Sequence, residues 1–349
     1  MAVRLRVFHG LVNYGTQAGL LAEALRQENI YAKSIIGPDI YNRKADFNFK
    51  SGGSLIWKIW YYGIYSFWFR TYCLFRFNIF HFYYGTSLFP YHMDLPIIKF
   101  LGKKVVHHYL GFDVELYETN MNKYDGGNMK NWSKEKGIKH DRIVKKRLSF
   151  ESKFSDYKLV CAPKYAQFVN GAEILPLAID VSSIEYSNLQ HKDGNSIRIL
   201  HVPTDRNIKG TMYIENAVQK LVDEGFKIDL KICEGVSHKE LEEEYSKCDF
   251  SVVSLIGGWY GQAGVEAMAY GRGIITFLSP EFLEFMSDDF KQKCPIVSAN
   301  KDSIYLELKK VIVRKRFSEW GLESRAFAEK FHNSKIVALR LIEIYKSLN

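Results

Sequence analysis

Short segments rich in apolar and β-branched residues alternate with amphipathic segments in two separate stretches of the chain. The first begins with Val3–His9, continues through an apolar-faced segment at Ala18–Glu28 and becomes extended again at Tyr31–Ile36. A strand, tight turn, helix and strand form a βαβ unit, which requires a parallel sheet and a right-handed crossover. The second stretch starts at Ile197–Val202 and repeats the alternation to about Leu278. The pattern predicts an α/β protein with two doubly wound, Rossmann-like domains.

The 349 residues suit two domains of ordinary size. A polar stretch, Tyr186–Asn195, follows the first series. We expect a first domain at residues 1–178, a second at 179–330, and a C-terminal helix at 331–349 that packs back on the first. Because ligands of open α/β sheets bind outside the carboxyl ends of the strands, we expect the two domains to face each other across a cleft lined by βα turns.

Cysteine usage and hydropathy argue against several classes of protein. The five cysteines are scattered without a Cys-x-x-Cys pair, which predicts buried thiols rather than zinc ligands or disulfides. The first residues lack the apolar core of a secretory signal, and the most apolar run, Leu55–Phe69, is too short to span a bilayer. We therefore expect a cytoplasmic protein, one that could also lie peripherally on the inner face of the cytoplasmic membrane.

The formal net charge of +9 is unevenly distributed. No Asp or Glu occurs between Phe47 and Met93, and nine basic residues accompany three acidic ones from Lys123 to Arg147. Such basic surfaces attract phosphorylated substrates, anionic lipid or nucleic acid. Residues 57–84 contain fifteen aromatic residues, a mixture that suits either an interfacial helix on an anionic membrane or a core helix followed by a strand. No RNA-binding signature is present, so nucleic acid is not an expected partner.

The segment His201-Val-Pro-Thr-Asp-Arg-Asn-Ile-Lys-Gly-Thr211 joins a predicted strand to a predicted helix. Arg206 and Lys209 stand in this turn. Two cations beside a helix N-terminus favour an anion, because the helix dipole and the free N–H groups add to the side-chain charges. A diphosphate is the natural ligand of such a turn, and a solvated loop with two surface cations is the alternative.

The segment Gly257-Gly-Trp-Tyr-Gly-Gln-Ala-Gly-Val-Glu-Ala-Met-Ala-Tyr-Gly271 lies between a buried strand and a helix. Its glycines would let backbone N–H groups approach a ligand closely. Glu266 falls about one turn into the helix, where its carboxylate could accept two hydrogen bonds from a ribose diol. The alternative for Glu266 is an acid favoured by the helix dipole. Trp259 and Tyr260 either shape a pocket or fill one.

Together, these two segments resemble the C-terminal signature of family-4 retaining glycosyltransferases of the GT-B fold. They look most like a bacterial branch with a Pro-Thr-x-Arg-x-x-Lys-Gly-Thr turn and a Gly-Trp-Tyr-Gly…Glu-Ala-Met-Ala segment. The resemblance implies a hexosyltransferase that moves a sugar from a nucleotide-diphosphate sugar to a hydroxyl acceptor with retention, in bacterial surface polysaccharide or glycolipid synthesis. It continues upstream in Phe80–Leu88, Asp94–Pro96, Leu101–Val106, His108–Asp113 and Leu175–Asp180.

The resemblance also implies roles for individual residues. Arg206 and Lys209 would neutralise the departing diphosphate, and His108 and Asp113 would contact the donor sugar or the acceptor hydroxyl. Glu266 would hold the donor ribose. The other donor-binding candidates are Thr211, Gly258, Tyr260, Gly261 and Gln262, and the acceptor or phosphate loop would comprise Gly10, Asn13, Tyr14 and Gly15.

One position departs from the family pattern. The family commonly carries Glu-x7-Glu, and Gly258 stands where the first Glu would be. Either the backbone of Gly258–Gly261 replaces that carboxylate or activity is reduced. The alternatives to a transferase are therefore a catalytically inactive nucleotide-sugar-binding partner and, as a different enzyme class, a nucleotide-sugar epimerase on the same fold.

The expected ligands follow from the same resemblance. The nucleotide sugar is a substrate, so we expect no cofactor, and we expect no metal because cations would do the neutralising and no Asp-x-Asp motif is present. The expected partners are the nucleotide-sugar donor, a saccharide or lipid-linked saccharide acceptor, and an anionic membrane surface.

Overall fold

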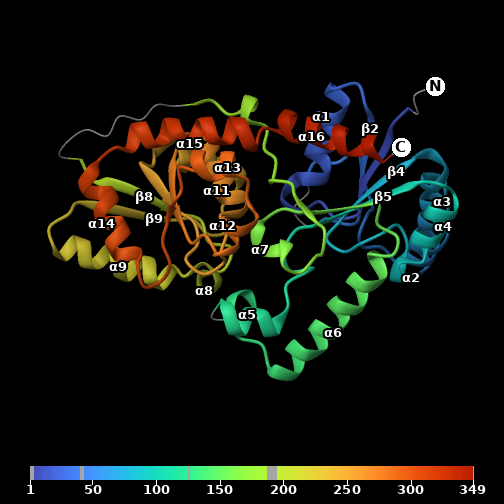
Figure 1. Cartoon of the computed structure of the whole chain (residues 1–349), viewed down its shortest axis with the longest axis horizontal. Helices are drawn as coiled ribbons and strands as arrows, with labels where there is room; N and C mark the ends of the chain where they lie inside the picture. The colour runs from blue at the N-terminus through green and yellow to red at the C-terminus, as the bar shows by residue number, and fades with distance from the viewer. Residues whose placement is uncertain (1–3, 40–42, 125, 187–194, 349) are drawn as a thin grey trace. The chain divides into compact units, whose positions relative to one another are not determined.

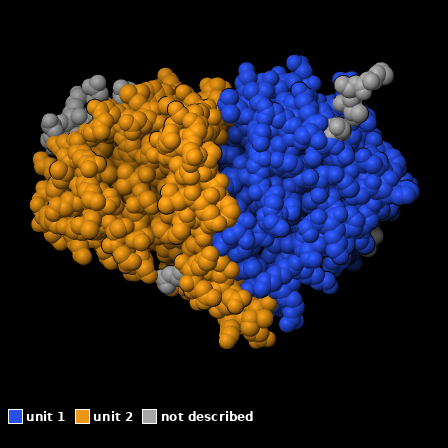
Figure 2. All heavy atoms as spheres, in the orientation of Figure 1, with its two compact units in different colours: residues 1–116, 139–178, 334–349 blue, residues 117–138, 179–333 orange. Residues whose placement is uncertain are grey.

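A computed structural model of the chain describes residues 4–39, 43–124, 126–186 and 195–348 (Figure 1). The chain divides into two compact units (Figure 2). Unit 1 contains residues 1–116, 139–178 and 334–349, and unit 2 contains residues 117–138 and 179–333. Residues 117–138, which we assigned to the first domain, belong to unit 2, and the domain bounds expected from the sequence stay a prediction.

Unit 1 contains a seven-stranded sheet in the order β3-β2-β1-β4-β5-β6-β7. All its neighbouring strands pair in parallel. The strand order reverses direction beside β1, which makes the β1/β4 pair a topological switch point, where ligands of such sheets bind. The strands are β1 (Arg6–Gly10), β2 (Tyr31–Ile36), β3 (Phe47–Asn48), β4 (Ile79–Tyr83), β5 (Lys104–Tyr109), β6 (Tyr157–Val160) and β7 (Glu173–Ile174).

Unit 2 contains a five-stranded, entirely parallel sheet in the order β12-β11-β10-β8-β9. β8 and β10 are direct neighbours, with Ile199 opposite Phe250, so the turns that follow these two strands leave the same edge. The strands are β8 (Ile197–His201), β9 (Ile228–Ile232), β10 (Phe250–Val252), β11 (Gly273–Thr276) and β12 (Val297–Ser298).

Helices connect the strands in both units. Local sequence explains several of their ends: a capping box between Ser237 and Glu240, for example, begins α10. The helices of unit 1 are α1 (Gln17–Gln27), α2 (Leu55–Lys58), α3 (Ser66–Arg76), α4 (Asp94–Phe100), α7 (Pro163–Ala166) and α16 (Ser334–Ser347), with the π-helix η2 (Ile59–Tyr65) between α2 and α3. Those of unit 2 are α5 (Tyr117–Lys123), α8 (Arg206–Lys209), α9 (Thr211–Asp223), α10 (His238–Lys247), α11 (Gly261–Ala269), α12 (Glu281–Phe285), α13 (Asp288–Lys293), α14 (Ile304–Arg314) and α15 (Phe317–Phe331). α6 (Lys134–Glu151) begins in unit 2 and ends in unit 1.

Two separate apolar clusters cover the two faces of the unit 1 sheet. α1 and α16 bury Leu21 and Leu341 on one face, together with Val7 of β1. On the other face, α3 and α4 bury Leu74 and Leu95. The last helix of the chain is thus part of the unit 1 core. No helix among the described residues has the length and apolar character needed to cross a bilayer.

The α16 packing generates a stability prediction. Leu341 is fully buried, whereas Leu339 on the same helix is 39% exposed. We expect Leu341→Ala to lower the unfolding free energy of unit 1 by about 2–5 kcal/mol, because lost transfer energy and a residual cavity add. Leu339→Ala should change it by less than about 0.5 kcal/mol. Urea unfolding followed by circular dichroism measures both, and equal effects of the two variants would contradict the packing.

Candidate functional site

The turn after β8 presents Arg206 at the surface. Asp205 caps α8, accepting hydrogen bonds from the backbone N–H groups of Asn207 and Ile208 at 2.8 and 3.1 Å. The exposed Arg206 guanidinium donates to Glu215 and, at 3.2 Å, to Glu234. The hydrogen bond to Glu215 raises the pKa of Arg206. Two carboxylates of unit 2 thus already meet the charge of this sequence-predicted site residue.

Lys209 differs from Arg206 in both burial and partners. It is half-buried, and burial lowers the pKa of its ammonium group. Within the described residues, the ammonium group has no hydrogen bond or ion pair. Withdrawing an unpaired charge from water is unfavourable. Since perturbed, uncompensated groups concentrate at functional sites, Lys209 is a candidate anion ligand.

The backbone around Lys209 joins two neighbouring loops. The Lys209 carbonyl accepts a hydrogen bond from Leu255 N at 3.1 Å. Gly210 has a φ of 76°, and a Cβ at this position would lie 3.2 Å from Leu255 Cβ. The turn after β8 therefore packs closely against the loop after β10, and the two sequence segments that suggested a site do meet.

Thr211 is engaged within the fold. His201 Nδ1 lies 2.7 Å from the Val252 carbonyl, to which it can only donate, so Nε2 accepts from the Thr211 hydroxyl at 2.8 Å. Both side chains are buried. The Thr211 hydroxyl group therefore links α9 to β8 and, through His201, to β10, and donor binding by Thr211 stays a prediction.

The loop after β10 and the start of α11 leave backbone and carboxylate groups uncompensated. Gly258 and Gly261 have φ angles of 78° and 55°, and nothing lies within 4 Å of a Cβ built on Gly261. No side chain caps the N-terminus of α11. Glu266 is half-buried, burial raises its pKa, and Gln262 Nε2 donates a hydrogen bond to its carboxylate at 3.4 Å. No cation pairs with Glu266 among the described residues.

Trp259 and Tyr260 fill the interior of unit 2. Their ring centroids lie 4.2 Å apart, and Trp259 also stacks with Phe290 of α13. The Tyr260 hydroxyl lies 2.9 Å from His332 Nε2, and the Tyr260 side chain is buried. Of the two alternatives for this aromatic pair, the structure shows rings packed inside unit 2, and donor binding by Tyr260 stays a prediction.

In unit 1, the loop after β1 combines tight backbone packing with one aromatic ring. A Cβ on Gly10 would lie 2.0 Å from the Ile35 carbonyl oxygen. Asn13 is buried, and its side chain donates to the Lys44 carbonyl at 3.1 Å and accepts from Gly19 N at 3.2 Å. Gly15 has a φ of 51°. The Asn13 side chain therefore fixes the loop through hydrogen bonds to two other segments of unit 1.

The Tyr14 ring connects the loop after β1 to the loop after β4. It stacks on Tyr84, which follows β4, with ring centroids 5.8 Å apart. Burial raises the pKa of Tyr14 to about 12, and the nearby Cys161 and Asp113 side chains contribute to the rise. The loops after β1, β4, β5 and β6 thus gather at one edge of the unit 1 sheet.

Asp113 is a buried carboxyl group with one open oxygen. Its Oδ1 accepts hydrogen bonds from Leu110 N at 3.1 Å and Gly111 N at 2.8 Å, whereas Oδ2 has no partner among the described residues. Burial raises the pKa of Asp113 to about 6, against the lowering effect of Arg147. A carboxyl group with this pKa exchanges protons near neutral pH and suits hydrogen bonding to a hydroxyl group.

His108 belongs to a chain of buried, neutral imidazoles. Its Nδ1 lies 3.3 Å from His81 Nε2, and His81 Nδ1 lies 2.6 Å from the Tyr345 hydroxyl of α16. His9 stacks on His81 with ring centroids 4.9 Å apart. Burial lowers the pKa values of His9 and His108 to about 3. His108 Nε2 has no hydrogen-bond partner in the described part of the chain.

Arg147, at the C-terminal end of α6, is a residue that the sequence analysis missed. Its guanidinium donates to the Asp113 carbonyl and lies against Gly85, where a Cβ would be 2.5 Å from Arg147 Cζ. Its Nε lies 3.5 Å from Glu151 Oε1. Arg147 therefore joins the loops after β4 and β5. The sequence analysis counted it only among the nine basic residues of Lys123–Arg147, and no local signal marked this arginine as the inward-facing one.

Glu151, also missed, is buried beside Arg147. Its Oε2 accepts a hydrogen bond from the Tyr109 hydroxyl at 2.9 Å. Burial raises the pKa of Glu151 to about 7. The end of α6 therefore supplies a partly compensated ion pair behind the Asp113 loop.

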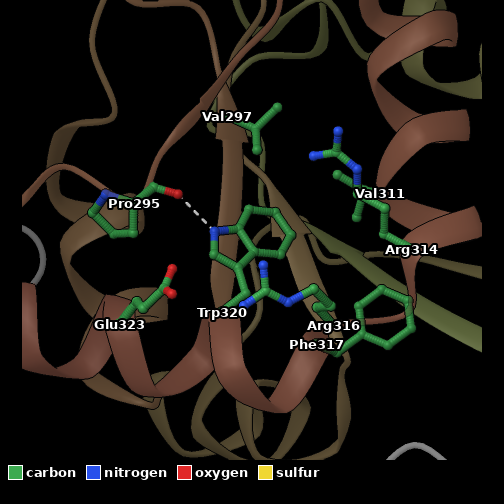
Figure 3. Close-up of a pocket in the computed structure, with 8 residues that line it drawn as sticks. All are labelled: Pro295, Val297, Val311, Arg314, Arg316, Phe317, Trp320 and Glu323. Carbon is green, nitrogen blue, oxygen red and sulfur yellow. Dashed lines mark hydrogen bonds between the residues drawn. The ribbon is translucent and has the colours of Figure 1, made fainter.

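A cavity of about 200 Å³ lies beside β12, apart from these residues (Figure 3). Trp320 donates from its indole N–H to the Pro295 carbonyl at 2.6 Å (Figure 3). None of the sequence-predicted site residues lines this cavity, whose walls are Pro295, Val297, Val311, Arg314, Arg316, Phe317, Trp320 and Glu323.

The residues expected at the site thus form two groups, one in each unit. In unit 2, Lys209 and the Gly258–Glu266 segment follow adjacent strands. In unit 1, Asp113 and Tyr14 share the carboxyl edge of the sheet. Each group contains polar side chains that the protein leaves incompletely paired.

No protein-family model matches the chain, and no curated protein matches it in sequence. Its structure is similar to sucrose-phosphate synthase from Thermosynechococcus elongatus, with 15% identity, a TM-score of 0.62, and coverage of 99% of this chain and 96% of that one. It is also similar to Anabaena HepE in complex with UDP-glucose (10% identity, TM-score 0.59, 98% and 99% coverage) and to S. aureus MnaA with UDP (12% identity, TM-score 0.54, 99% and 97% coverage). These likenesses, together with the two parallel sheets, confirm the predicted GT-B fold.

The buried titratable groups of unit 1 predict a stability that falls with acidification. His9, His107 and His108 have pKa values lowered to about 3 in the folded chain, so only the unfolded chain takes up their protons below about pH 6.5. Each of the three imidazoles should therefore lower the unfolding free energy by about 2 kcal/mol at pH 5 compared with pH 7.5. Asp113 and Glu151 have raised pKa values in the folded chain, so acidification protonates them more readily there than in the unfolded chain. Together they should raise the unfolding free energy by about 4 kcal/mol over the same pH range. The effect of the three imidazoles is the larger one, so urea unfolding should show a lower unfolding free energy at pH 5 than at pH 7.5.

A stability that stays constant or rises between pH 7.5 and 5 would show that the buried imidazoles do not remain neutral.

Proposed function

We propose that this protein is a glycosyltransferase that moves a sugar, with retention, from a nucleoside-diphosphate sugar to a hydroxyl acceptor. The observation that carries the proposal is the half-buried Lys209, whose ammonium group has no carboxylate partner among the described residues and whose backbone carbonyl joins the two βα loops. A bound diphosphate would supply the missing negative charge. The GT-B fold is consistent with this chemistry but does not establish it.

UDP-sugars are the first donors to test. Two of the similar structures, HepE and MnaA, are complexes with UDP-glucose and with UDP. In this chain, Lys209 and the uncapped N-terminus of α11 would contact the diphosphate. Glu266 would accept hydrogen bonds from the ribose hydroxyls. Its carboxylate suits that role because no cation within the described residues neutralises it.

Arg206 would reach the diphosphate by exchanging partners. Its guanidinium is exposed, and its contacts to Glu215 and Glu234 are surface ion pairs. Exposed ion pairs contribute little, so a doubly charged phosphate group can replace them at small cost. Lys209 would bind the diphosphate without giving up a partner, whereas Arg206 would first release its two carboxylate partners.

The proposed reaction breaks the bond between the anomeric carbon and the diphosphate oxygen. The electron pair of that bond leaves with the nucleoside diphosphate, where cations and N–H donors stabilise the growing charge. The acceptor oxygen bonds to the anomeric carbon from the same face, and its proton passes to the leaving phosphate oxygen. We expect the two cations and the backbone to suffice without a metal ion or a cofactor, and the backbone of Gly258–Gly261 to stand in for the missing carboxylate.

The acceptor side of the proposal rests on unit 1. Asp113 Oδ2 is buried without a partner among the described residues, so it can accept a hydrogen bond from an acceptor or sugar hydroxyl. The open Nε2 of His108 is the second candidate at this edge. A saccharide or lipid-linked saccharide in bacterial surface polysaccharide or glycolipid synthesis would be the acceptor, and a cytoplasmic protein bound peripherally to the inner membrane face would meet it.

Replacing Lys209 separates binding from folding. We expect Lys209→Met to weaken UDP binding by about tenfold or more, because a charge-assisted hydrogen bond is lost. Without ligand, the variant should melt no lower than the wild type, since an unpaired, half-buried charge disappears. Isothermal titration calorimetry with UDP, GDP and ADP and thermal melting measure the two effects. Lys220→Met, which removes an exposed lysine of α9, is the matched control and should bind as the wild type.

Several outcomes would overturn the proposal. Unchanged UDP affinity in Lys209→Met would remove the anion site, and a wild type that binds none of the three diphosphates would remove the donor class. Conversion of a UDP-sugar to another UDP-sugar without acceptor would identify an epimerase. Donor binding without turnover on any acceptor would identify an inactive binding partner.

The ribose role of Glu266 predicts a linked effect. The wild type should bind UDP about tenfold more tightly than 2′-deoxy-UDP, because the half-buried Glu266 carboxylate loses a hydroxyl partner in the analogue. In Glu266→Gln this preference should shrink, while the unfolding temperature without ligand stays the same or rises. The control, Glu284→Gln, removes an exposed carboxylate and should keep the preference. Retention of the full preference in Glu266→Gln would contradict the assignment.

A further inference from the structure

One outer surface of unit 1 exposes large apolar side chains. Trp68 is 67% exposed on α3, and Phe100, at the end of α4, is 89% exposed. Scattered exposed apolar residues are ordinary, but contiguous groups mark interaction sites. We call this surface the aromatic face and define it by Trp60, Ile64, Trp68, Tyr72, Phe75 and Phe100.

The α3 helix is apolar on both of its sides. Cys73 and Leu74 point into the core cluster that also contains Leu95 and Ile98 of α4. On the opposite side, Trp68, Tyr72 and Phe75 follow at spacings of four and three residues and are all exposed. Large apolar side chains thus occupy both the inner and the outer side of α3, and no described residue of this chain covers the outer ones. Contiguous exposed apolar side chains of this kind mark interaction sites.

α3 and the segment that leads into α4 form one continuous surface. The rings of Phe67 and Phe89 lie 5.7 Å apart, and Arg70 donates to the Leu88 carbonyl at 2.5 Å. α2, α3 and α4 lie together beside the sheet (Figure 1). Lys103, three residues after Phe100, donates to the Phe77 carbonyl at 2.6 Å, which places the end of α4 beside the end of α3. Exposed rings of α3 and α4 therefore lie near each other, whereas the sequence analysis considered residues 57–84 alone.

The charges around the aromatic face are positive. No acidic residue occurs between Phe47 and Met93. The nearby Asp94 is fully buried and accepts hydrogen bonds from Ser87 Oγ at 2.6 Å and Leu88 N at 3.0 Å. Lys58 at the end of α2 is exposed, and Arg76 at the end of α3 is half-buried over the Tyr31 ring. A second copy of the same face would bring like charges together, which disfavours self-association.

We propose that the aromatic face docks on the interface of an anionic lipid bilayer. Aromatic rings partition to the boundary between headgroups and acyl chains, and Lys and Arg beside them bind anionic headgroups. Because no described helix could cross a bilayer, the docking would be peripheral. The inference uses unit 1 alone and does not depend on the proposed reaction.

Vesicle co-sedimentation tests the docking. The full chain is mixed with vesicles of phosphatidylethanolamine and phosphatidylglycerol, or of phosphatidylcholine alone. We expect binding to the anionic vesicles that weakens with added salt, and at least about tenfold weaker binding by Trp68→Ser combined with Phe100→Ser. The matched control, Leu283→Ser with Leu306→Ser, removes two exposed apolar side chains from unit 2 and should bind as the wild type. Circular dichroism and UDP titration verify that each variant is folded.

A second readout distinguishes insertion from surface adsorption. Trp60 and Trp68 should be quenched by brominated acyl chains if the rings enter the interface. The proposal is overturned if the wild type stays in the supernatant with anionic vesicles, or if the double variant binds them as the wild type does. It is also overturned if the wild type forms a dimer without lipid that the double variant abolishes, because the face would then be a protein interface. Loss of vesicle binding with intact UDP binding leaves the proposed function standing.

Discussion

Parallel pairing of every strand is the constraint on which both units depend. Neighbouring parallel strands begin at the same edge of a sheet, so the chain must cross over after each one, and the βα turns collect at the carboxyl edge. In unit 2 this brings the Lys209 turn against the loop that contains Leu255. In unit 1 it brings Tyr14 and Asp113 to one edge. The candidate residues come together because of sheet topology, although they are far apart in the chain.

The polar residues at these edges fall into two classes. His201 with Thr211, and Tyr260 with His332, satisfy each other inside unit 2 and contribute to its stability. Lys209, by contrast, is half-buried without a charge partner in the described residues. An unpaired, partly buried charge lowers stability, and such a cost is expected where a ligand supplies the partner. This contrast in pairing is the reason that we propose Lys209, rather than the paired polar residues, as a diphosphate ligand.

Unit 1 combines a conventional core with an unusual exterior. Apolar clusters cover both faces of its sheet, yet α3 carries a second apolar side outward. The end of α6 adds Arg147 and Glu151, which support the Asp113 loop from outside the sheet. The same unit thus carries the proposed acceptor edge and the proposed membrane surface. If the acceptor is lipid-linked, the membrane surface would hold the protein on the bilayer in which the acceptor is anchored, and the acceptor edge would bind its hydroxyl group.

Local pattern alone determined the alternation of strands and helices, the capping box of α10 and the glycine-rich turns, because these depend on residues close together in the chain. The alternation predicted two doubly wound domains, and the resemblance implied the GT-B fold, which is confirmed, whereas the family-4 assignment stays a prediction. Only tertiary structure decided that Tyr260 packs inside, that Arg206 is ion-paired and that Arg147 joins two loops. The physical reason is that burial and charge compensation are set by groups from distant segments, and no local spacing specifies which partner arrives.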